Sequence, residues 1–343
     1  MRTAIVLFNL GGPDRIEAVK PFRVNLFSDK AIIRAPWFIR VWLARLIAAS
    51  SARAAVANYR LLGGKSPLLD LTRAQARALE AELGPDYRCF IAMRYWHPFA
   101  RETAAAVKAW APERVILLPL YPQFSTTTTG SSLADWREAA ARAGLAAPVT
   151  TLCCWFDDPA YIDSVAAMVR AGLAEARAAR PGVGLRLLFS AHGLPEAIVK
   201  AGDPYAAQVA AAMAAVMARL GDEAVEAVLC YQSRATPQKW LEPSTIAAIE
   251  QAGREGKGVV VVPIAFVSDH IETLVELDIE NRHVAQAAGV PVYVRARVGN
   301  DDPDFIRALA GLARRAAAPG LCRGGGACGP AHRDCPWERR RAA

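Results

Sequence analysis

Acidic side chains recur at short, regular intervals around a histidine in the segment 268–280. The carboxylates follow one another at spacings of three, four and four residues: Asp269, Glu272, Glu276 and Glu280. A helix capped by Ser268 or Asp269 would carry all four on one face, where like charges repel. Such a stripe is either an ordinary solvated face or one compensated by cations. Because it lies beside His270, we expect a divalent cation as its partner.

A second candidate for chemistry is His192, which follows an apolar run and precedes Gly193-Leu-Pro195. A side chain in such a loop, at the end of a buried strand, is presented to a crevice rather than packed. Its imidazole can accept a proton near neutral pH. The alternative is a core histidine whose ring nitrogens are both satisfied.

Three further segments carry polar or aromatic groups in expected loops. The hydroxyl-rich run Phe124–Ser132 leads into a helix, where hydroxyls and backbone amides suit an anion such as a carboxylate, or simply cap the helix. Arg94-Tyr95-Trp96-His97-Pro98 adds a guanidinium and aromatic planes, and Gln238-Lys239-Trp240 adds another plane.

Nucleotide binding is not supported by the glycine motifs. Gly11 and Gly12 follow a strand, but Pro13 and Asp14 break the dinucleotide fingerprint. Gly64-Lys65-Ser66 resembles the end of a phosphate loop, yet the position of its first glycine is occupied by a tyrosine. We interpret these as turn glycines.

The elements that must position these residues alternate between short apolar strands and long helical stretches, which is typical of α/β folds with parallel sheets. Most of the strands are apolar on both faces, as a sheet covered by helices on both sides requires. The expected strands are Thr3–Asn9, Arg88–Met93, Val115–Leu120, Val149–Cys153, Arg186–Ser190, Ala227–Tyr231, Val259–Pro263 and Val292–Arg295.

A weak internal repeat predicts two similar halves. The run beginning Val115-Ile-Leu-Leu-Pro119 reappears as Val259-Val-Val-Val-Pro263, and each copy feeds a polar loop and then a helix. We therefore expect two similar α/β halves, 1–150 and 151–316, followed by a cysteine-containing tail, 317–343. In open α/β sheets, ligands bind at the carboxyl ends of the strands, so the crevice between the halves is the expected site.

Length and composition agree with two folded domains. The chain has 343 residues, of which 53% are apolar and 22% charged, so it is not expected to be disordered. The formal charge of +8 favours anionic partners or an anionic lipid surface without pointing to nucleic acid. The N-terminus enters a strand without a secretory leader, so we expect a cytoplasmic protein.

Taken in order along the chain, these motifs resemble the ferrochelatases, which insert ferrous iron into a porphyrin in haem synthesis. The strings that carry the resemblance are Asn9-Leu-Gly-Gly-Pro13, Gly63-Gly-Lys-Ser-Pro67, Arg94-Tyr95, Tyr121-Pro-Gln, Thr128-Thr-Gly-Ser-Ser132, Ser190-Ala-His-Gly-Leu-Pro195, Gly202-Asp-Pro-Tyr205 and Pro263-Ile-Ala-Phe-Val-Ser-Asp-His-Ile-Glu-Thr-Leu274. They span about residues 4 to 316. An ordered series of this length is far more specific than any one string.

The resemblance implies two Rossmann-like domains with the porphyrin in the cleft between them. It implies that His192 and Glu272 face each other across the macrocycle, with His192 accepting pyrrole protons or binding incoming iron. Glu276 and Asp269 would extend the acidic path for the metal. The residues implied to contact the porphyrin are Leu10, Arg94, Tyr95, Trp240, Phe266 and His270, with Tyr59 and Ser66 at positions that hold its propionates.

The function so implied is insertion of ferrous iron into protoporphyrin IX, with release of two protons and no redox or nucleotide cofactor in the reaction. The alternatives are a chelatase for coproporphyrin or another tetrapyrrole, and a non-catalytic haem or metal carrier on the same fold. Because a carrier needs no proton acceptor, the presence of both His192 and Glu272 argues against it.

The segment Pro36–Ser50, within a region of about 22–50, matches the family's apolar lip around the pocket mouth. It is too short and too interrupted by Arg40 and Arg45 to cross a bilayer. Two interpretations are open: an ordinary packed helix, or a segment seated in an anionic membrane interface. The second makes the protein peripheral on the inner face of the cytoplasmic membrane, as a monomer or homodimer.

Cysteines crowd into the end of the chain, at Cys322, Cys328 and Cys335. Some ferrochelatases hold a [2Fe-2S] cluster through four cysteines, three of them C-terminal. The resemblance therefore implies such a cluster here, with Cys153 or Cys154 as the fourth ligand. The spacing departs from the animal pattern, and a structural zinc site is the competing interpretation.

Overall fold

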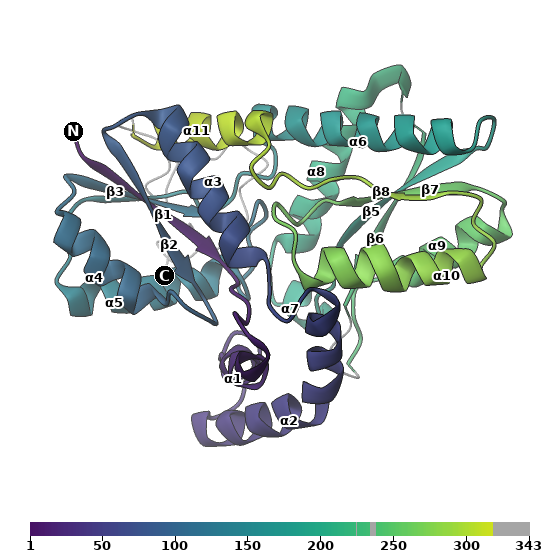
Figure 1. Cartoon of the computed structure of the whole chain (residues 1–343). Helices are drawn as coiled ribbons and strands as arrows, with labels where there is room; N and C mark the ends of the chain where they lie inside the picture. The colour runs from purple at the N-terminus through teal and green to yellow at the C-terminus, as the bar shows by residue number, and fades with distance from the viewer. Residues whose placement is uncertain (224, 234–237, 318–343) are drawn as a thin grey trace. The chain divides into compact units, whose positions relative to one another are not determined.

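The computed structural model of the chain describes residues 1–223, 225–233 and 238–317 (Figure 1). By their internal contacts, residues Met1–Cys154 form one unit, which the chain rejoins at Leu309, and Trp155–Ala308 form a second. The division therefore falls a few residues after the expected boundary at 150. The expected second domain, 151–316, also differs, because helix α11 (Pro303–Ala317) begins in the second unit and continues in the first.

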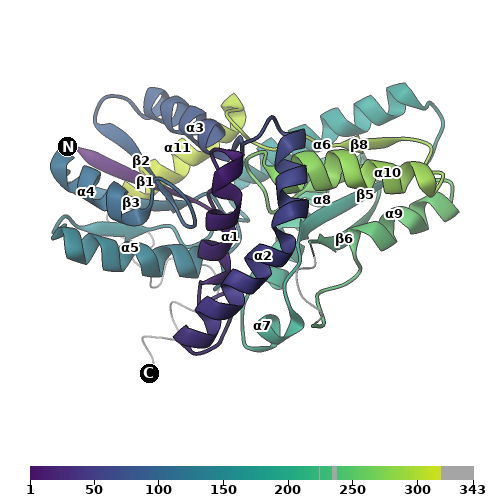
Figure 2. The ribbon, with the colours of Figure 1, turned by 60° about the horizontal axis from the view of Figure 1, so that its bottom comes forward.

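The first unit is built on a four-stranded parallel sheet of order β2-β1-β3-β4. Its strands are β1 (Thr3–Asn9), β2 (Tyr87–Met93), β3 (Arg114–Pro119) and β4 (Val149–Thr151). Its helices are the 3-10 turn Ile16–Ala18, α1 (Val19–Phe27), α2 (Trp37–Leu61), α3 (Leu68–Leu83), α4 (Ala100–Trp110) and α5 (Thr129–Ala143). Helices α4 and α5 cover one face of the sheet and α3 the other (Figures 1 and 2). Every residue of β1 is buried, as a doubly covered strand requires.

The second unit repeats this plan with a parallel sheet of order β6-β5-β7-β8. Its strands are β5 (Leu185–His192), β6 (Glu226–Gln232), β7 (Gly258–Pro263) and β8 (Tyr293–Arg295). Its helices are α6 (Pro159–Ala179), α7 (Glu196–Lys200), α8 (Tyr205–Leu220), the 3-10 turn Gly221–Glu223, α9 (Thr245–Arg254), the π-helix Glu272–Glu280 and α10 (Asn281–Ala287), which precede α11. Helices α6 and α8 cover one face and α9 and α10 the other (Figure 1).

The predicted α/β fold is confirmed, since all eight expected strands are present and both sheets share one strand order. The strand ends lie within two residues of the sequence prediction, and those of β1 agree with it at both ends. The difference matters at β5, which extends as far as His192 and places it in register with Gln232 of β6. His192 therefore lies at the carboxyl edge of this sheet, where the loop after β7 also begins.

Helix α2 bends midway along its length (Figure 1). Ser50 and Ser51 both donate their hydroxyls to the carbonyl of Ile47, and Arg23 of α1 donates to Ser51 Oγ. Serine hydroxyls bonded back to the preceding turn commonly bend a helix, which accounts for the change of direction. In the parts of the chain that the structure describes, no helix combines the length and the apolar character needed to span a bilayer.

Candidate functional site

His192, the last residue of β5, is held in one tautomer by its neighbour. Its Nδ1 lies 2.6 Å from the Gly193 carbonyl oxygen, which can only accept, so Nδ1 carries the proton. In the neutral ring, Nε2 then presents a lone pair. Gly193 donates its backbone N–H to the Gln232 carbonyl at 2.7 Å, and a Cβ there would lie 3.0 Å from that same oxygen and 3.2 Å from Trp240. Any larger residue would therefore have to displace the Gln232 carbonyl or Trp240 by a few tenths of an ångström.

His270 is held in the same way on the loop after β7. Its Nδ1 lies 3.1 Å from the Ser268 carbonyl, and its backbone is bonded in both directions to the Thr273 hydroxyl. The ring is 7% exposed and packs against Phe266, with 4.7 Å between centroids. This leaves His270 Nε2 directed away from the loop backbone.

Both imidazoles turn Nε2 toward one carboxylate, Glu272 at the start of the π-helix. His192 Nε2 lies 3.7 Å from Glu272 Oε1, and His270 Nε2 lies 3.6 Å from Glu272 Oε2. The Oε2 atom is buried and has no hydrogen-bond partner among the described residues. Two lone pairs and a carboxylate this close together require a proton or a cation between them.

The pKa values of the two glutamates of the site are shifted in opposite directions. Burial alone would raise the pKa of the Glu272 carboxyl, but the two nearby imidazoles, His192 and His270, lower it to about 2. Burial and the Glu272 charge raise the pKa of Glu276. Glu276 also accepts from the Ser233 backbone N–H at 2.9 Å and from Gln232 Nε2 at 3.2 Å. Carboxyls separated in this way can divide the acid and base roles of a reaction between them.

The helix that carries these groups is not the one expected from the spacing. It begins after Ile271 and is wound as a π-helix, so Asp269 lies ahead of it in the loop. The Asp269 carboxylate instead lies 3.2 Å from Arg295 Nη1 and accepts from Asn300 Nδ2 at 2.9 Å, while Glu280 is exposed. The predicted stripe of four carboxylates on one face is therefore wrong, because a cation on β8 engages Asp269.

No group of three or more histidine, cysteine, aspartate and glutamate side chains is arranged to hold a metal ion within the described ranges. His192, Glu272 and His270 lie close together. Glu276 is near enough for the charge of Glu272 to raise its pKa. Trp240 lies beside His192, with 6.5 Å between ring centroids.

In the first unit, the predicted porphyrin contacts Arg94 and Tyr95 converge on a buried carboxylate that sequence reasoning missed. Asp29 Oδ2 accepts from Arg94 Nη2 at 2.9 Å, from the Tyr95 hydroxyl at 2.8 Å and from Ser131. Burial would raise the pKa of Asp29, but Arg94 and these donors hold it below its ordinary value. The anion expected for the hydroxyl-rich run thus comes from the chain itself.

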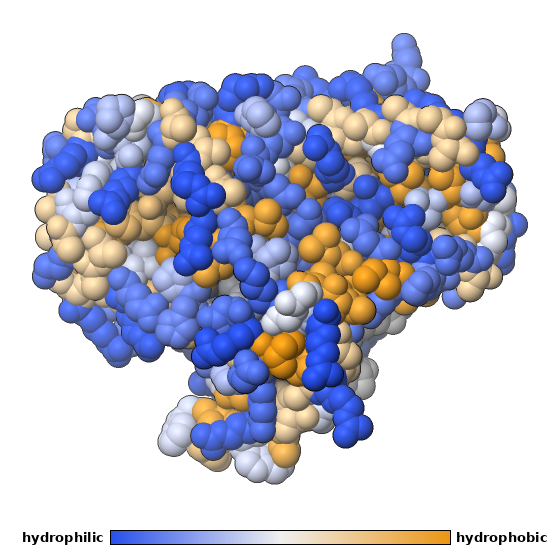
Figure 3. Space-filling model, in the orientation of Figure 1, coloured by the Kyte–Doolittle hydropathy of each residue, from blue (hydrophilic) through white to orange (hydrophobic). Residues whose placement is uncertain are grey.

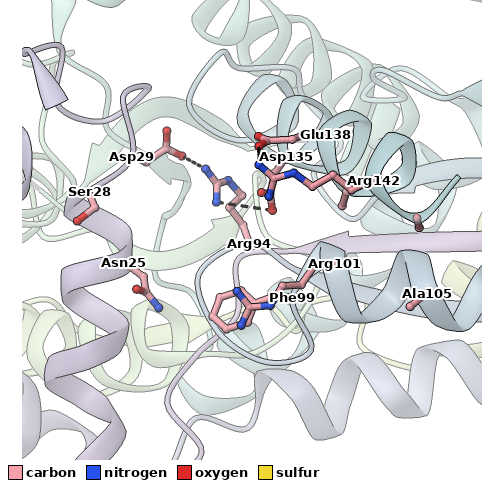
Figure 4. Close-up of a pocket in the computed structure, with 12 residues that line it drawn as sticks. Asn25, Ser28, Asp29, Arg94, Phe99, Arg101, Ala105, Asp135, Glu138 and Arg142 are labelled. Carbon is pink, nitrogen blue, oxygen red and sulfur yellow. Dashed lines mark hydrogen bonds and ion pairs between the residues drawn. The ribbon is translucent and has the colours of Figure 1, made fainter.

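A pocket of about 550 Å³ lies beside this network in the first unit (Figure 4). Arg94 stands between two acids there, with Asp135 Oδ2 3.7 Å from its Nη1. Arg142 pairs with Glu138, which lies beside Asp135 on α5 (Figure 4). Arg94 and Arg142 of this pocket thus each face a carboxylate of the chain itself.

The remaining predicted contacts of the first unit are largely buried. Ser66 is 7% exposed, and its hydroxyl accepts from the backbone N–H of Leu68 at the start of α3, while Tyr59 is 5% exposed. Leu10 is partly buried against a cluster that includes Tyr95. Gly11 has a φ of 86° and Gly12 leaves no room for a Cβ beside Ser66, as expected of turn glycines.

The cysteine prediction falls partly outside the structure. Cys322, Cys328 and Cys335 lie outside the described residues. Cys153 and Cys154 follow β4 and pack with Phe124, with 3.9 Å between their sulfur atoms; Cys153 is 3% exposed and Cys154 is more open.

The residues that sequence reasoning missed at the His192 site are Gln232 and Ser233, which anchor Glu276. The available signal was their position directly after an expected strand, at the same sheet edge as His192.

Comparison with known proteins agrees with this geometry. The family described as Ferrochelatase matches residues 2–317. Ferrochelatase of Phenylobacterium zucineum is 51% identical over 98% of each chain, and that of Caulobacter vibrioides is 49% identical over 100% of this chain and 99% of the relative. The fold resembles SirB from Bacillus subtilis, solved with Fe3+, with a TM-score of 0.54 at 13% identity over 93% of this chain and 96% of the other. By the family match and these relatives, the chain belongs to the ferrochelatase family.

Proposed function

We propose that this protein inserts ferrous iron into protoporphyrin IX and forms protohaem with release of two protons. The observation that carries the proposal is the convergence of His192 Nε2 and His270 Nε2 on the Glu272 carboxylate, at 3.7 and 3.6 Å. Such a site attracts a cation and can take up a proton, which are the two requirements of porphyrin metallation. Relatives at 49–51% identity carry the name Ferrochelatase.

Each role follows from the geometry of the site. His192 Nδ1 is occupied by the Gly193 carbonyl, so Nε2 is the atom that accepts a pyrrole proton or meets the incoming iron. Glu272 remains ionised because its pKa is lowered to about 2, and it stabilises the imidazolium that results. Glu276, whose pKa is raised, can hold the proton next. Trp240 and Phe266, beside the two histidines, offer aromatic surface to a flat ring.

The decisive experiment mixes the protein anaerobically with ferrous iron and protoporphyrin IX and follows conversion of the porphyrin absorption bands to those of haem. Coproporphyrin, run in parallel, tests the alternative substrate. We expect turnover with protoporphyrin that His192→Ala abolishes. Faster turnover with coproporphyrin would move the assignment to that substrate. Binding of haem without turnover of either porphyrin would identify a carrier.

We further propose that Cys322, Cys328, Cys335 and one of the adjacent cysteines after β4 bind a [2Fe-2S] cluster, since four thiolates are what such a cluster requires. Of the two described candidates, the more open Cys154 is better placed as a ligand than the buried Cys153. When bound, the cluster would supply folding free energy to the end of the chain.

Purified protein should then be red-brown, with about two irons and two sulfides per chain, as the cluster type requires. Cys154→Ser should remove the colour and Cys153→Ser should retain it. If protein isolated without oxygen contains one zinc per chain and no sulfide, the cysteines bind zinc and the cluster assignment is wrong.

We also propose that the first half of α2 seats the protein on the inner face of the cytoplasmic membrane, as a monomer or homodimer. Large apolar side chains there are 41–71% exposed: Trp37, Phe38, Ile39, Trp42 and Leu46. In Figure 3, the lower projection that contains α2 shows hydrophobic and hydrophilic side chains together. Helices of this kind bind anionic lipid surfaces.

Vesicles of anionic lipid should therefore sediment the wild-type protein, and Trp37→Ser with Trp42→Ser should reduce binding. Equal sedimentation of the wild type and of this double variant would refute membrane binding through the first half of α2.

A further inference from the structure

Arg295, the last residue of β8, joins two carboxylates on either side of the His270 and Glu272 positions. Its Nε and Nη2 donate to the two oxygens of Asp278 at 2.8 and 2.9 Å, a bidentate pair. Its Nη1 lies 3.2 Å from Asp269 Oδ1. The side chain is only 11% exposed, so these ion pairs are shielded from water.

The two acids bracket the site along the chain. Asp269 directly precedes His270 and stands three residues before Glu272, whereas Asp278 lies in the π-helix two residues after Glu276. A single guanidinium therefore ties the loop that enters the π-helix to the body of that helix. The planar group can meet two carboxylates in this way, whereas an ammonium is a point charge.

Other contacts around Arg295 show that β8 is fastened to the π-helix. The Tyr293 hydroxyl donates to the Leu277 carbonyl at 2.7 Å, and Arg282 donates to the carbonyls of Tyr293 and Asp278. Asn300 exchanges two hydrogen bonds with Asp269, both 2.9 Å long. Burial alone would lower the pKa of the Arg295 guanidinium, but Asp278 and Asp269 raise it, so the group stays charged.

We propose that Arg295 is a positioning residue for iron insertion, which fixes the loop that carries His270 against the π-helix that carries Glu272 and keeps the Asp269 carboxylate from competing for the metal. This inference rests on the proposed function of the site. A π-helix is a rare winding that occurs mostly at functional sites, and here the long-range clamp fixes where its first carboxylate stands. Groups that orient metal-binding side chains typically change activity or metal affinity about 10- to 100-fold when they are removed.

The test compares Arg295→Met and Arg295→Lys with a matched control, Arg186→Met. Arg186 is also a buried arginine that joins two carboxylates, Glu226 and Glu255, in the same unit. It lies near the start of β5, six residues or about 20 Å along the strand from His192. Replacing Arg186 should lower the free energy of unfolding, as replacing Arg295 does, but it should leave the side chains of the site in place.

We expect Arg295→Met to lower kcat about 10- to 100-fold, with the porphyrin KM within about threefold of wild type. Arg295→Lys should recover part of this loss, because it restores the charge without the bidentate pair. Arg186→Met should lower the melting midpoint and leave kcat unchanged. If Arg295→Met does not fold, the test rests on Arg295→Lys. A kcat below that of wild type supports the proposal, and a wild-type kcat overturns it.

Wild-type kcat in both Arg295 variants, or an equal loss in Arg186→Met, would overturn the proposal. Failure of the wild-type protein to insert iron would instead overturn the proposed function, so the two failures are distinguishable.

Discussion

Replacing Glu272 with glutamine tests the charge balance of the site directly. The carboxylate is held by two imidazoles, which lower its pKa from 4.5 to about 2. A tenfold change in an ionisation constant corresponds to about 1.4 kcal/mol, so the lowered pKa corresponds to about 3 kcal/mol of stabilisation of the ionised carboxylate in the folded protein. In the variant, the charge of Glu272 no longer repels the Glu276 carboxylate, whose pKa it raises in the wild type. The loss of this repulsion offsets part of the lost stabilisation.

The sign of the pH dependence follows from the lowered pKa. The contribution is complete above the ordinary carboxyl pKa and is lost as pH falls through about 2. The stability difference between wild type and Glu272→Gln should therefore be present at pH 7 and pH 5 and smaller at pH 3. Simple repulsion between carboxylates predicts the opposite, a stabilised variant.

Urea unfolding followed by circular dichroism at these three pH values measures the difference. Glu280→Gln is the matched control, because this residue ends the same π-helix but is exposed. It should change stability by no more than about 0.5 kcal/mol at any pH. A difference for Glu272→Gln that is constant with pH, or a more stable variant at pH 5, would refute the electrostatic reasoning.

Two other substitutions follow from the described contacts. His192→Ala should lower the rate of metallation about 10²- to 10⁴-fold while porphyrin still quenches tryptophan fluorescence on binding, and turnover within threefold of wild type would contradict its role. Asp29→Asn should lower the free energy of unfolding by about 1–3 kcal/mol at pH 7, because Arg94 loses its buried partner. Since the pKa of Asp29 is lowered, this difference should vanish as pH falls below the ordinary range of a carboxyl, and an unchanged difference in acid, measured by urea unfolding, would assign the effect to shape rather than charge.

The local pattern of the chain was sufficient to locate the strands of both sheets, with their ends correct to within two residues. Strands buried on both faces are continuous apolar runs, as in β1 and β7, and they can be recognised without any knowledge of their neighbours. The polar residue after such a run falls at the carboxyl edge of the sheet, which is why His192 was predicted correctly as a group at the end of a strand.

Charge pairing across long sequence separations was decided only by the tertiary structure. Asp269 and Glu272 look equivalent in a spacing of three, yet Arg295, 26 residues later, engages the first and leaves the second to the histidines. Asp29 likewise finds Arg94 65 residues away. A periodic pattern reports which residues share a face of a regular α-helix, but it carries no information about which distant cation meets them, or about a helix that winds as a π-helix.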